Sequence, residues 1–292
     1  MIVNIVCCGS SGSTLLSNRL DRHPDIISGE ELNIFSKNYF FENFNLVKRN
    51  ISFFLEHPMY DFPYNFWGEF LTNLECYNIT DNQIKNWISE SKNIKNFVYK
   101  VKKHLLKSNK SKVWVEKTPN NALALNNFLS EFNNKNTKVI HLIRNPKDVI
   151  LSLNKRGYSL FNAAERWIST VGNIRELAKK NKILLIKYED LIKNTNKTYE
   201  KICNYIDVDF KEDYFVDRKN ISKNIIRKNG LNTWSNSPDN NISRSSLNKY
   251  LDSKIKFDFL DKIIISKDFA NRFDINQYSY NELVDYYNYY IN

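Results

Sequence analysis

The sequence predicts an α/β protein of three layers, in which helices cover both faces of a central parallel sheet. Short, nearly continuous apolar runs at Ile2–Val6, Lys138–Ile143 and Ile183–Lys187 are typical of strands that are buried on both faces. A segment with helical periodicity follows each run. Strands that alternate with helices in this way form a parallel sheet with right-handed crossovers.

The first strand leads directly into a Gly/Ser-rich loop, residues 9–14 (GSSGST), and then into a helix that His23-Pro24 ends. Such a loop turns several backbone N–H groups toward one point, and the helix N-terminus adds partial positive charge, so the loop suits phosphate or sulfate. It is not a Walker A loop, because Ser13 stands at the lysine position and Cys7 at the first glycine. This argues against an ordinary ATPase or kinase. A tight turn without a ligand explains the loop equally well.

The remaining segments add an insertion and a tail to this pattern. Residues 35–108 are rich in aromatic side chains and predict a helical insertion without a clear strand. A long amphipathic helix is predicted over about 161–180, and a polar loop followed by a tail over about 229–292. Because no internal repeat and no Gly/Pro-rich linker divides the chain, we expect a single domain over 1–292.

Composition restricts the classes of function. The sequence has 43 Lys and Arg against 32 Asp and Glu, a net charge of +11 that favours an anionic partner such as a nucleotide, nucleic acid, sulfated sugar or acidic peptide. The four cysteines form no CxxC pair, so neither a zinc ribbon nor a disulfide framework is predicted. Neither a signal-peptide pattern nor an apolar run of about 18 residues occurs, so we expect a cytoplasmic protein without a transmembrane segment.

Two segments carry a resemblance to a known family. They are SSGSTLL at 10–16 followed by HPDIISGEE at 23–31, and VIHLIRNPKDVILSLNKRG at 139–157. The first resembles the 5′-phosphosulfate loop of the sulfotransferases, with a loop-to-glutamate spacing similar to that of tyrosylprotein sulfotransferase and its bacterial relatives. The second resembles the 3′-phosphate motif of that family, an arginine ending a strand and a serine in the next helix. Weaker similarities follow in chain order at 116–119 (EKTP), 187–191 (KYEDL) and 246–250 (SLNKY).

The resemblance implies a P-loop-type fold and an enzyme that moves a sulfuryl group from 3′-phosphoadenosine 5′-phosphosulfate (PAPS) to a hydroxyl or amine by in-line transfer. The product would be adenosine 3′,5′-bisphosphate (PAP), and no metal would be required. Glu31 would be the base that accepts the acceptor proton, and Lys117 the cation that balances charge on the transferring group. The implied nucleotide contacts are Ser10, Ser11, Gly12, Ser13, Thr14, Arg144, Ser152, Arg156, Tyr188, Trp234 and Lys249.

Alternatives stay open at this point. The family normally has Arg or Lys at the position of Ser10, so either Lys117 and the loop amides stabilise the leaving group, or the chain is a catalytically impaired nucleotide-binding relative. Asn33 stands where peptide-sulfating members carry arginine, which argues against an acidic peptide as the acceptor; a sugar, phenol, lipid headgroup or peptide all stay open. A kinase without its usual lysine and a basic nucleic-acid-binding protein are further alternatives. Because no compact basic and aromatic platform is present, no specific nucleic acid is expected.

Overall fold

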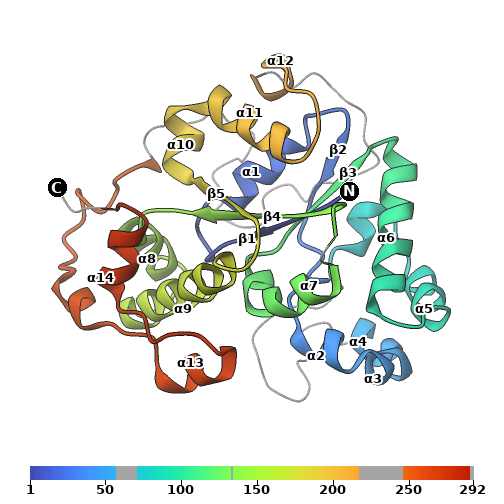
Figure 1. Ribbon diagram of the computed structural model, residues 1–292, viewed down its shortest axis with the longest axis horizontal. Helices are drawn as coiled ribbons and strands as arrows, with labels where there is room; N and C mark the ends of the chain where they lie inside the picture. Colours follow the sequence, from blue (N-terminus) through green and yellow to red (C-terminus); the bar gives the residue numbers. More distant parts are fainter. Residues whose placement is uncertain (57–70, 133, 217–245, 290–292) are drawn as a thin grey trace.

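The computed structural model describes residues 1–56, 71–132, 134–216 and 246–289, and within them one parallel sheet has the strand order β2-β3-β1-β4-β5 (Figure 1). The strands are β1 (Ile2–Val6), β2 (Ile26–Ser28), β3 (Val113–Lys117), β4 (Thr137–Ile143) and β5 (Ile183–Lys187). All neighbouring strands pair in parallel. The predicted α/β class and the three predicted strands are confirmed, while β2 and β3 were not predicted.

Strand β1 lies at the centre of the sheet, where its nearly unbroken apolar sequence requires burial on both faces. It pairs with β3 on one side, placing Ile2 opposite Trp114, and with β4 on the other, placing Val6 opposite His141. All five β1 side chains are buried. The loop that follows β1 is therefore flanked by the ends of both neighbouring strands.

Helices cover both faces of the sheet, as predicted (Figure 1). One face carries α1 (Ser13–Leu20), α10 (Tyr188–Lys193) and α11 (Thr195–Tyr205). The other carries α7 (Leu125–Phe132), α8 (Pro146–Asn154) and α9 (Leu160–Ala178). Helix α9 corresponds to the long helix expected over 161–180.

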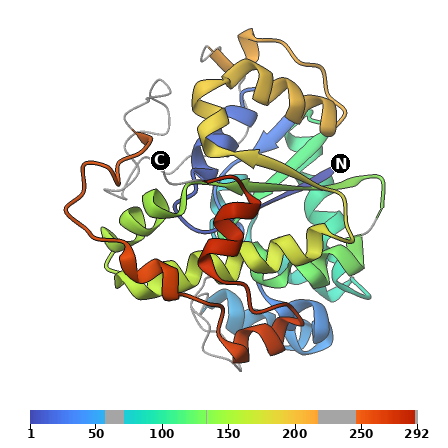
Figure 2. The same ribbon diagram turned by 60° about the vertical axis from the view of Figure 1, so that its left-hand side comes forward.

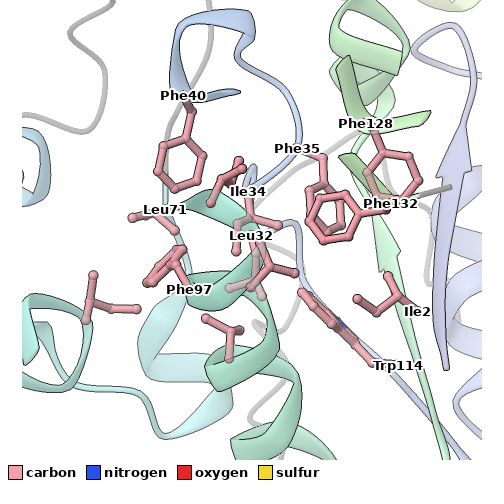
Figure 3. Packing of buried hydrophobic residues seen from close by; sticks show 14 of the residues in the cluster. Ile2, Leu32, Ile34, Phe35, Phe40, Leu71, Phe97, Trp114, Phe128 and Phe132 are labelled. Carbon is pink, nitrogen blue, oxygen red and sulfur yellow. The ribbon is translucent and has the colours of Figure 1, made fainter. Parts of the chain in front are cut away.

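The described part of the insertion is helical, with no strand among its described residues. Its elements are α2 (Asn38–Glu42), α3 (Phe44–Arg49), α4 (Ile51–Glu56), the 3₁₀ helix η1 (Leu74–Tyr77), α5 (Asp81–Ser89) and α6 (Ile94–Asn109). Many of its aromatic rings belong to the core (Figure 3): the Phe35 ring centroid lies 4.7 Å from that of Phe128 and 5.8 Å from that of Trp114. Phe40 and Phe97 are also fully buried. These buried rings form part of the hydrophobic core.

The tail after residue 246 packs beside α8 and α9 (Figure 2). The tail contains the 3₁₀ helix η4 (Asp258–Lys262), α13 (Lys267–Phe273) and α14 (Tyr280–Tyr286). The short helix α12 (Asp213–Val216) precedes it in the chain. A Cβ on Gly172 of α9 would lie 2.5 Å from Cδ1 of Ile265, so the tail approaches α9 closely here and Ile265 would have to shift to admit a larger residue. No helix in the described part of the chain is both long and apolar enough to cross a membrane.

Candidate functional site

The carboxyl ends of the parallel strands meet along one edge of the sheet, which is where ligands of open α/β sheets bind (Figure 1). Most predicted site residues follow strand ends along this edge. The Gly/Ser loop follows β1, Lys117 ends β3, Arg144 follows β4, Tyr188 follows β5, and Glu31 comes shortly after β2. The fold thus gathers residues that are far apart in the sequence.

The two predicted catalytic side chains are in direct contact. The Lys117 Nζ lies 2.8 Å from the Glu31 Oε1 and 3.4 Å from the Thr14 hydroxyl oxygen. The Lys117 side chain is 3% exposed, whereas that of Glu31 is 36% exposed. The ammonium is therefore held out of water between the carboxylate and the loop, and the carboxylate remains accessible to a second molecule.

Contacts on both sides hold the Glu31 segment in place. The Glu31 carbonyl accepts hydrogen bonds from Asn73 Nδ2 (2.7 Å) and from the Thr72 hydroxyl (3.1 Å). Two residues further on, the backbone N–H of Asn33 donates to the Thr118 hydroxyl just beyond β3 (3.3 Å), and Asn33 has a φ of +56°. Because the next helix begins only at Asn38, Glu31 does not cap a helix N-terminus.

The loop after β1 has the shape expected of an anion-binding turn. Ser10 (φ +70°) and Gly12 (φ +92°) both adopt positive φ, and Gly12 is the N-cap of α1. The hydroxyl oxygens of Ser10 and Ser11 are buried and have no hydrogen-bond partner among the described residues. A buried hydroxyl without a partner is costly, so these two groups are suited to a polar ligand. The side chain of Thr14 is exposed, whereas that of Ser13 is buried and contacts the Cys7 thiol.

Gly12 is required for two separate reasons, and Gly12→Ala tests both. A Cβ there would lie 2.4 Å from the Tyr188 ring, and an L-residue at this φ is strained. We expect the free energy of unfolding to fall by about 2 kcal/mol or more, since left-handed strain alone costs about 1 kcal/mol and the ring must also move. Urea unfolding measures this change.

Two other glycines serve as matched controls. Gly157 has a φ of +93° with no atom near its missing Cβ, and the Cβ of an alanine at Gly9 would meet only an ordinary contact at 3.8 Å. Gly157→Ala should therefore show the strain cost alone, and Gly9→Ala should be nearly neutral. If Gly12→Ala is no less stable than Gly157→Ala, the close approach of Tyr188 does not matter.

Arg144, the main residue of the second predicted anion-binding motif, contacts the loop directly. Its Nη1 donates to the Ser10 carbonyl (3.1 Å) and its Nη2 to the Ser246 carbonyl (2.5 Å). Its guanidinium carbon lies 4.6 Å from the centroid of the Tyr188 ring, and the Tyr188 hydroxyl donates to Ser246 Oγ (2.8 Å). Asp148, one helical turn later, pairs with Arg144 at 3.5 Å. The loop and the Arg144 motif are therefore direct neighbours.

Asp148 fixes the closing segment 246–250 over α8. Its carboxylate accepts the backbone N–H of Asn248 (2.9 Å) and that of Tyr250 (3.2 Å). Lys249 lies between these two residues with an exposed side chain. Sequence reasoning missed Asp148, although its position four residues after Arg144 was a usable signal. Trp234, a predicted nucleotide contact, lies outside the described residues.

Ser152 and Arg156 are less closely connected to Arg144. Ser152 is half-buried near the end of α8. Within the described part of the chain, Ser152 and Arg144 form no hydrogen bond with each other. Arg156 is exposed in the turn after α8, within electrostatic range of Glu31 and of Arg166. It therefore lies toward the Glu31 side of the loop.

Glu189 accepts a hydrogen bond from the N-cap residue of α8 and so stabilises the start of that helix. Its Oε1 accepts the backbone N–H of Asn145 (2.9 Å), and its Oε2 accepts the hydroxyl of Tyr289 (2.8 Å). The last described helix and the residues after it are thereby tied to the residue next to Arg144.

All four cysteines are buried. All four are free. Burial raises the pKa of Cys7 and of Cys8, which precede the loop, to about 12, so both remain protonated thiols near neutral pH. Among the described residues, no group of three or more His, Cys, Asp or Glu side chains is placed to hold a metal ion.

The residue before Lys117 in β3, Glu116, carries a buried carboxyl group that sequence reasoning missed. Glu116 is 2% exposed and accepts hydrogen bonds from the Thr118 hydroxyl (2.6 Å) and from Asn121 Nδ2, which also donates to Asn4 Oδ1 (2.8 Å). Burial raises the pKa of Glu116 to about 7, against the lowering effect of these hydrogen bonds. The EKTP segment contained this residue, but nothing in its spacing indicated burial.

The raised pKa of Glu116 makes stability depend on pH. The folded protein retains this proton up to about pH 7, whereas the unfolded chain releases it near pH 4.5, so between these values the folded state binds more protons. The free energy of unfolding should therefore fall as pH rises through this window, by up to about 3 kcal/mol. Urea unfolding at a series of pH values measures the slope, which Glu116→Gln should flatten. Equal slopes in the two proteins would contradict the prediction.

Comparison with known proteins gives the family to which this site belongs. The model of the sulfotransferase family matches residues 3–212. The chain therefore belongs to the sulfotransferase family, as the sequence resemblance predicted.

Solved structures agree with this assignment at the level of the fold. The sulfotransferase domain of the Synechococcus PCC 7002 olefin synthase superposes with a TM-score of 0.61 at 20% identity, over 100% of this chain and 95% of that one. The sulfotransferase domain from the curacin biosynthetic pathway superposes with a TM-score of 0.57 at 19% identity, over 95% of this chain and 98% of that one.

Sequence comparison matches shorter stretches of the chain. A guinea pig (Cavia porcellus) 3-alpha-hydroxysteroid sulfotransferase is 31% identical over 107 residues, which is 29% of this chain and 36% of that protein. The chain thus matches less than half the length of its curated relatives.

Proposed function

We propose that this protein transfers a sulfuryl group from PAPS to a hydroxyl or amine acceptor, with Glu31 as the base. The observation that carries the proposal is the contact of Lys117 with both Glu31 and Thr14 of the loop. It joins a base, a buried cation and an anion-binding turn in one place. Membership of the sulfotransferase family supports the same reaction.

The residues along the edge fit a nucleotide with phosphate groups at both ends. The loop offers the N–H groups of the first turn of α1, which have no acceptor within the helix, and the hydroxyls of Ser10 and Ser11. Arg144 offers its Nε, which is buried and has no partner among the described residues. Because Arg144 touches the loop itself, one adenosine bisphosphate can reach both groups.

Each residue has a definite role in the proposed transfer. The donor supplies an electrophilic sulfur bonded to the bridging oxygen of its 5′-phosphate. Glu31 accepts the proton of the acceptor hydroxyl while the acceptor oxygen forms a bond to sulfur and the sulfur–bridging oxygen bond breaks. Lys117 and the loop amides stabilise the negative charge that remains on the 5′-phosphate. Because the transition state of such a transfer is loose, the protein acts mainly by positioning and electrostatics.

A catalytically impaired nucleotide-binding relative is the second candidate, and Ser10 is the observation that favours it. Ser10 occupies a position where the family normally has a cation, and its carbonyl is held by Arg144. In the first candidate, Lys117 replaces that missing cation, because it contacts the same loop through Thr14. The two candidates differ in turnover and agree in nucleotide binding.

The test has two stages. Titration with PAP by calorimetry examines the nucleotide site, with ATP and magnesium as the comparison. Incubation with sulfur-labelled PAPS and a panel of phenols, sugars, hydroxysteroids and tyrosine peptides then examines transfer; hydroxysteroids are included because the name of a matched relative specifies them. Transfer to any acceptor excludes the impaired relative. Preference for ATP and magnesium, or no binding of PAP, overturns the proposal.

A further inference from the structure

A second basic residue, Arg166, is held by Asn120, three residues after Lys117. Just after Lys117, the 3₁₀ helix η2 (Pro119–Ala124) begins, and Asn120 in its first turn accepts a hydrogen bond from Arg166 Nη2 (2.9 Å). Arg166 belongs to the second turn of α9, and its Nη1 donates to the Tyr158 hydroxyl (3.0 Å). The guanidinium carbon also lies 5.4 Å from the centroid of the Tyr158 ring.

All of these contacts to Arg166 are neutral. An amide oxygen and a phenol hydroxyl orient the guanidinium, and no carboxylate of residues 1–56, 71–132, 134–216 or 246–289 lies within ion-pair distance of it. Arginine has five N–H donors, so three remain after these two hydrogen bonds. The side chain is half-buried, and the positive charge of Arg156 acts in the same neighbourhood. Among the described residues, the Arg166 guanidinium is thus held by neutral groups.

The order of the strands places Asn120, which holds Arg166, on the opposite side of β1 from Arg144. Arg144 follows β4, on one side of β1, whereas Asn120 and Lys117 follow β3, on the other side. If the loop after β1 holds the 5′-phosphosulfate and Arg144 the 3′-phosphate, Arg166 lies on the side of Glu31. An acceptor whose hydroxyl reaches Glu31 must occupy the same side.

We infer that Arg166, oriented by Asn120 and Tyr158, forms a subsite for a carboxylate group of the acceptor, so that the preferred acceptors are hydroxy acids. The inference rests on the proposed sulfuryl transfer and narrows its substrate class. A planar guanidinium with free N–H groups matches the two oxygens of a carboxylate better than any neutral group. Arg166 would bind and orient the acceptor and would not contact the transferring sulfur.

The test uses pairs of probes that differ only in charge. We would measure the binding of 3-hydroxybenzoate and 3-hydroxybenzamide, and of 3-hydroxybutyrate and its amide, to the enzyme–PAP complex by calorimetry, and kcat/KM for the same pairs with labelled PAPS. The wild type should prefer the acid of at least one pair about 10-fold or more, as expected for hydrogen bonds to a charged group. Arg166→Gln should reduce this preference to about 2-fold or less while PAP binding stays unchanged. Arg166→Lys, which keeps the charge without the fork, should retain part of the preference.

Arg272→Gln is the matched control, because it removes the same charge from α13, far along the chain. It should leave the preference for the acid unchanged. The inference is overturned if the wild type binds acid and amide equally, if it binds no probe, or if Arg166→Gln keeps the full preference. Equal turnover of acid and amide would leave sulfuryl transfer intact and reject only the carboxylate subsite. A wild-type protein that does not bind PAP would reject the proposed function itself.

Discussion

Arg144→Ala is expected to lower both the stability of the fold and the affinity for PAP. The side chains of Arg144 and Asp148 are 9% and 1% exposed, so the substitution leaves a carboxylate buried without its cation. Breaking such a pair from one side costs about 3–5 kcal/mol. The carbonyls of Ser10 and Ser246 also lose a donor, which loosens the loop and the closing segment. Urea unfolding and calorimetric titration with PAP measure the two effects.

A double variant separates the two effects. Arg144→Ala/Asp148→Asn removes the uncompensated charge, and the asparagine oxygen can still accept one of the two N–H groups that Asp148 holds. Stability should recover in part, whereas affinity for PAP should remain low because the guanidinium is still absent. An Arg144→Ala protein as stable as the wild type would mean that the ion pair contributes nothing. Normal affinity in the double variant would place the 3′-phosphate elsewhere.

Glu31→Gln is expected to lower kcat by about 100-fold to 10,000-fold, the usual contribution of a positioned general base. The amide oxygen can still accept a hydrogen bond from Lys117, so the pair keeps its geometry while losing the ability to accept a proton. Affinity for PAP should change little, because Glu31 does not belong to the loop. Single-turnover transfer from labelled PAPS measures the chemical step directly.

The neighbouring carboxylate provides the control. Glu30 is half-buried and is held through its backbone carbonyl by the Tyr77 hydroxyl (2.6 Å), so Glu30→Gln should leave kcat nearly unchanged. If Glu31→Gln retains more than a tenth of the wild-type kcat, Glu31 is not the base. If both substitutions reduce kcat equally, the effect is one of charge near the site.

The strands show which parts of the fold can be predicted from local sequence. The runs that became β1, β4 and β5 were recognisable because each is mostly apolar and bounded by loop residues. Strand β2 has only three residues, too few for a pattern. In β3 the apolar run ends at Val115, before Glu116 and Lys117, whose burial depends on their contacts with Asn121, Thr118 and Glu31. Those partners come from the tertiary structure.

The candidate site divides in a similar way. Glu31, Lys117 and Arg144 were predicted from the resemblance to the sulfotransferases, and the structure brings all three to one edge of the sheet. Ser246 and Arg166 gained their significance only from contacts across the chain, with Arg144 at a separation of 102 residues and with Asn120 at 46. A local sequence pattern cannot predict such a contact, because the contact depends on how segments far apart in the sequence pack in the folded protein.

The hydrogen bond from Tyr289 to Glu189 has a consequence for the order in which the molecule matures during synthesis. Glu189 supports the first turn after β4, yet its second oxygen receives a partner only from a tyrosine added 100 residues later. Asp148 likewise waits for Asn248, which follows it by 100 residues. Until these late residues have been synthesised, the nascent chain lacks the hydrogen bonds that Tyr289 donates to Glu189 and that Asn248 donates to Asp148. We therefore expect the start of α8 to become fully hydrogen-bonded only after Asn248 and Tyr289 have joined the fold.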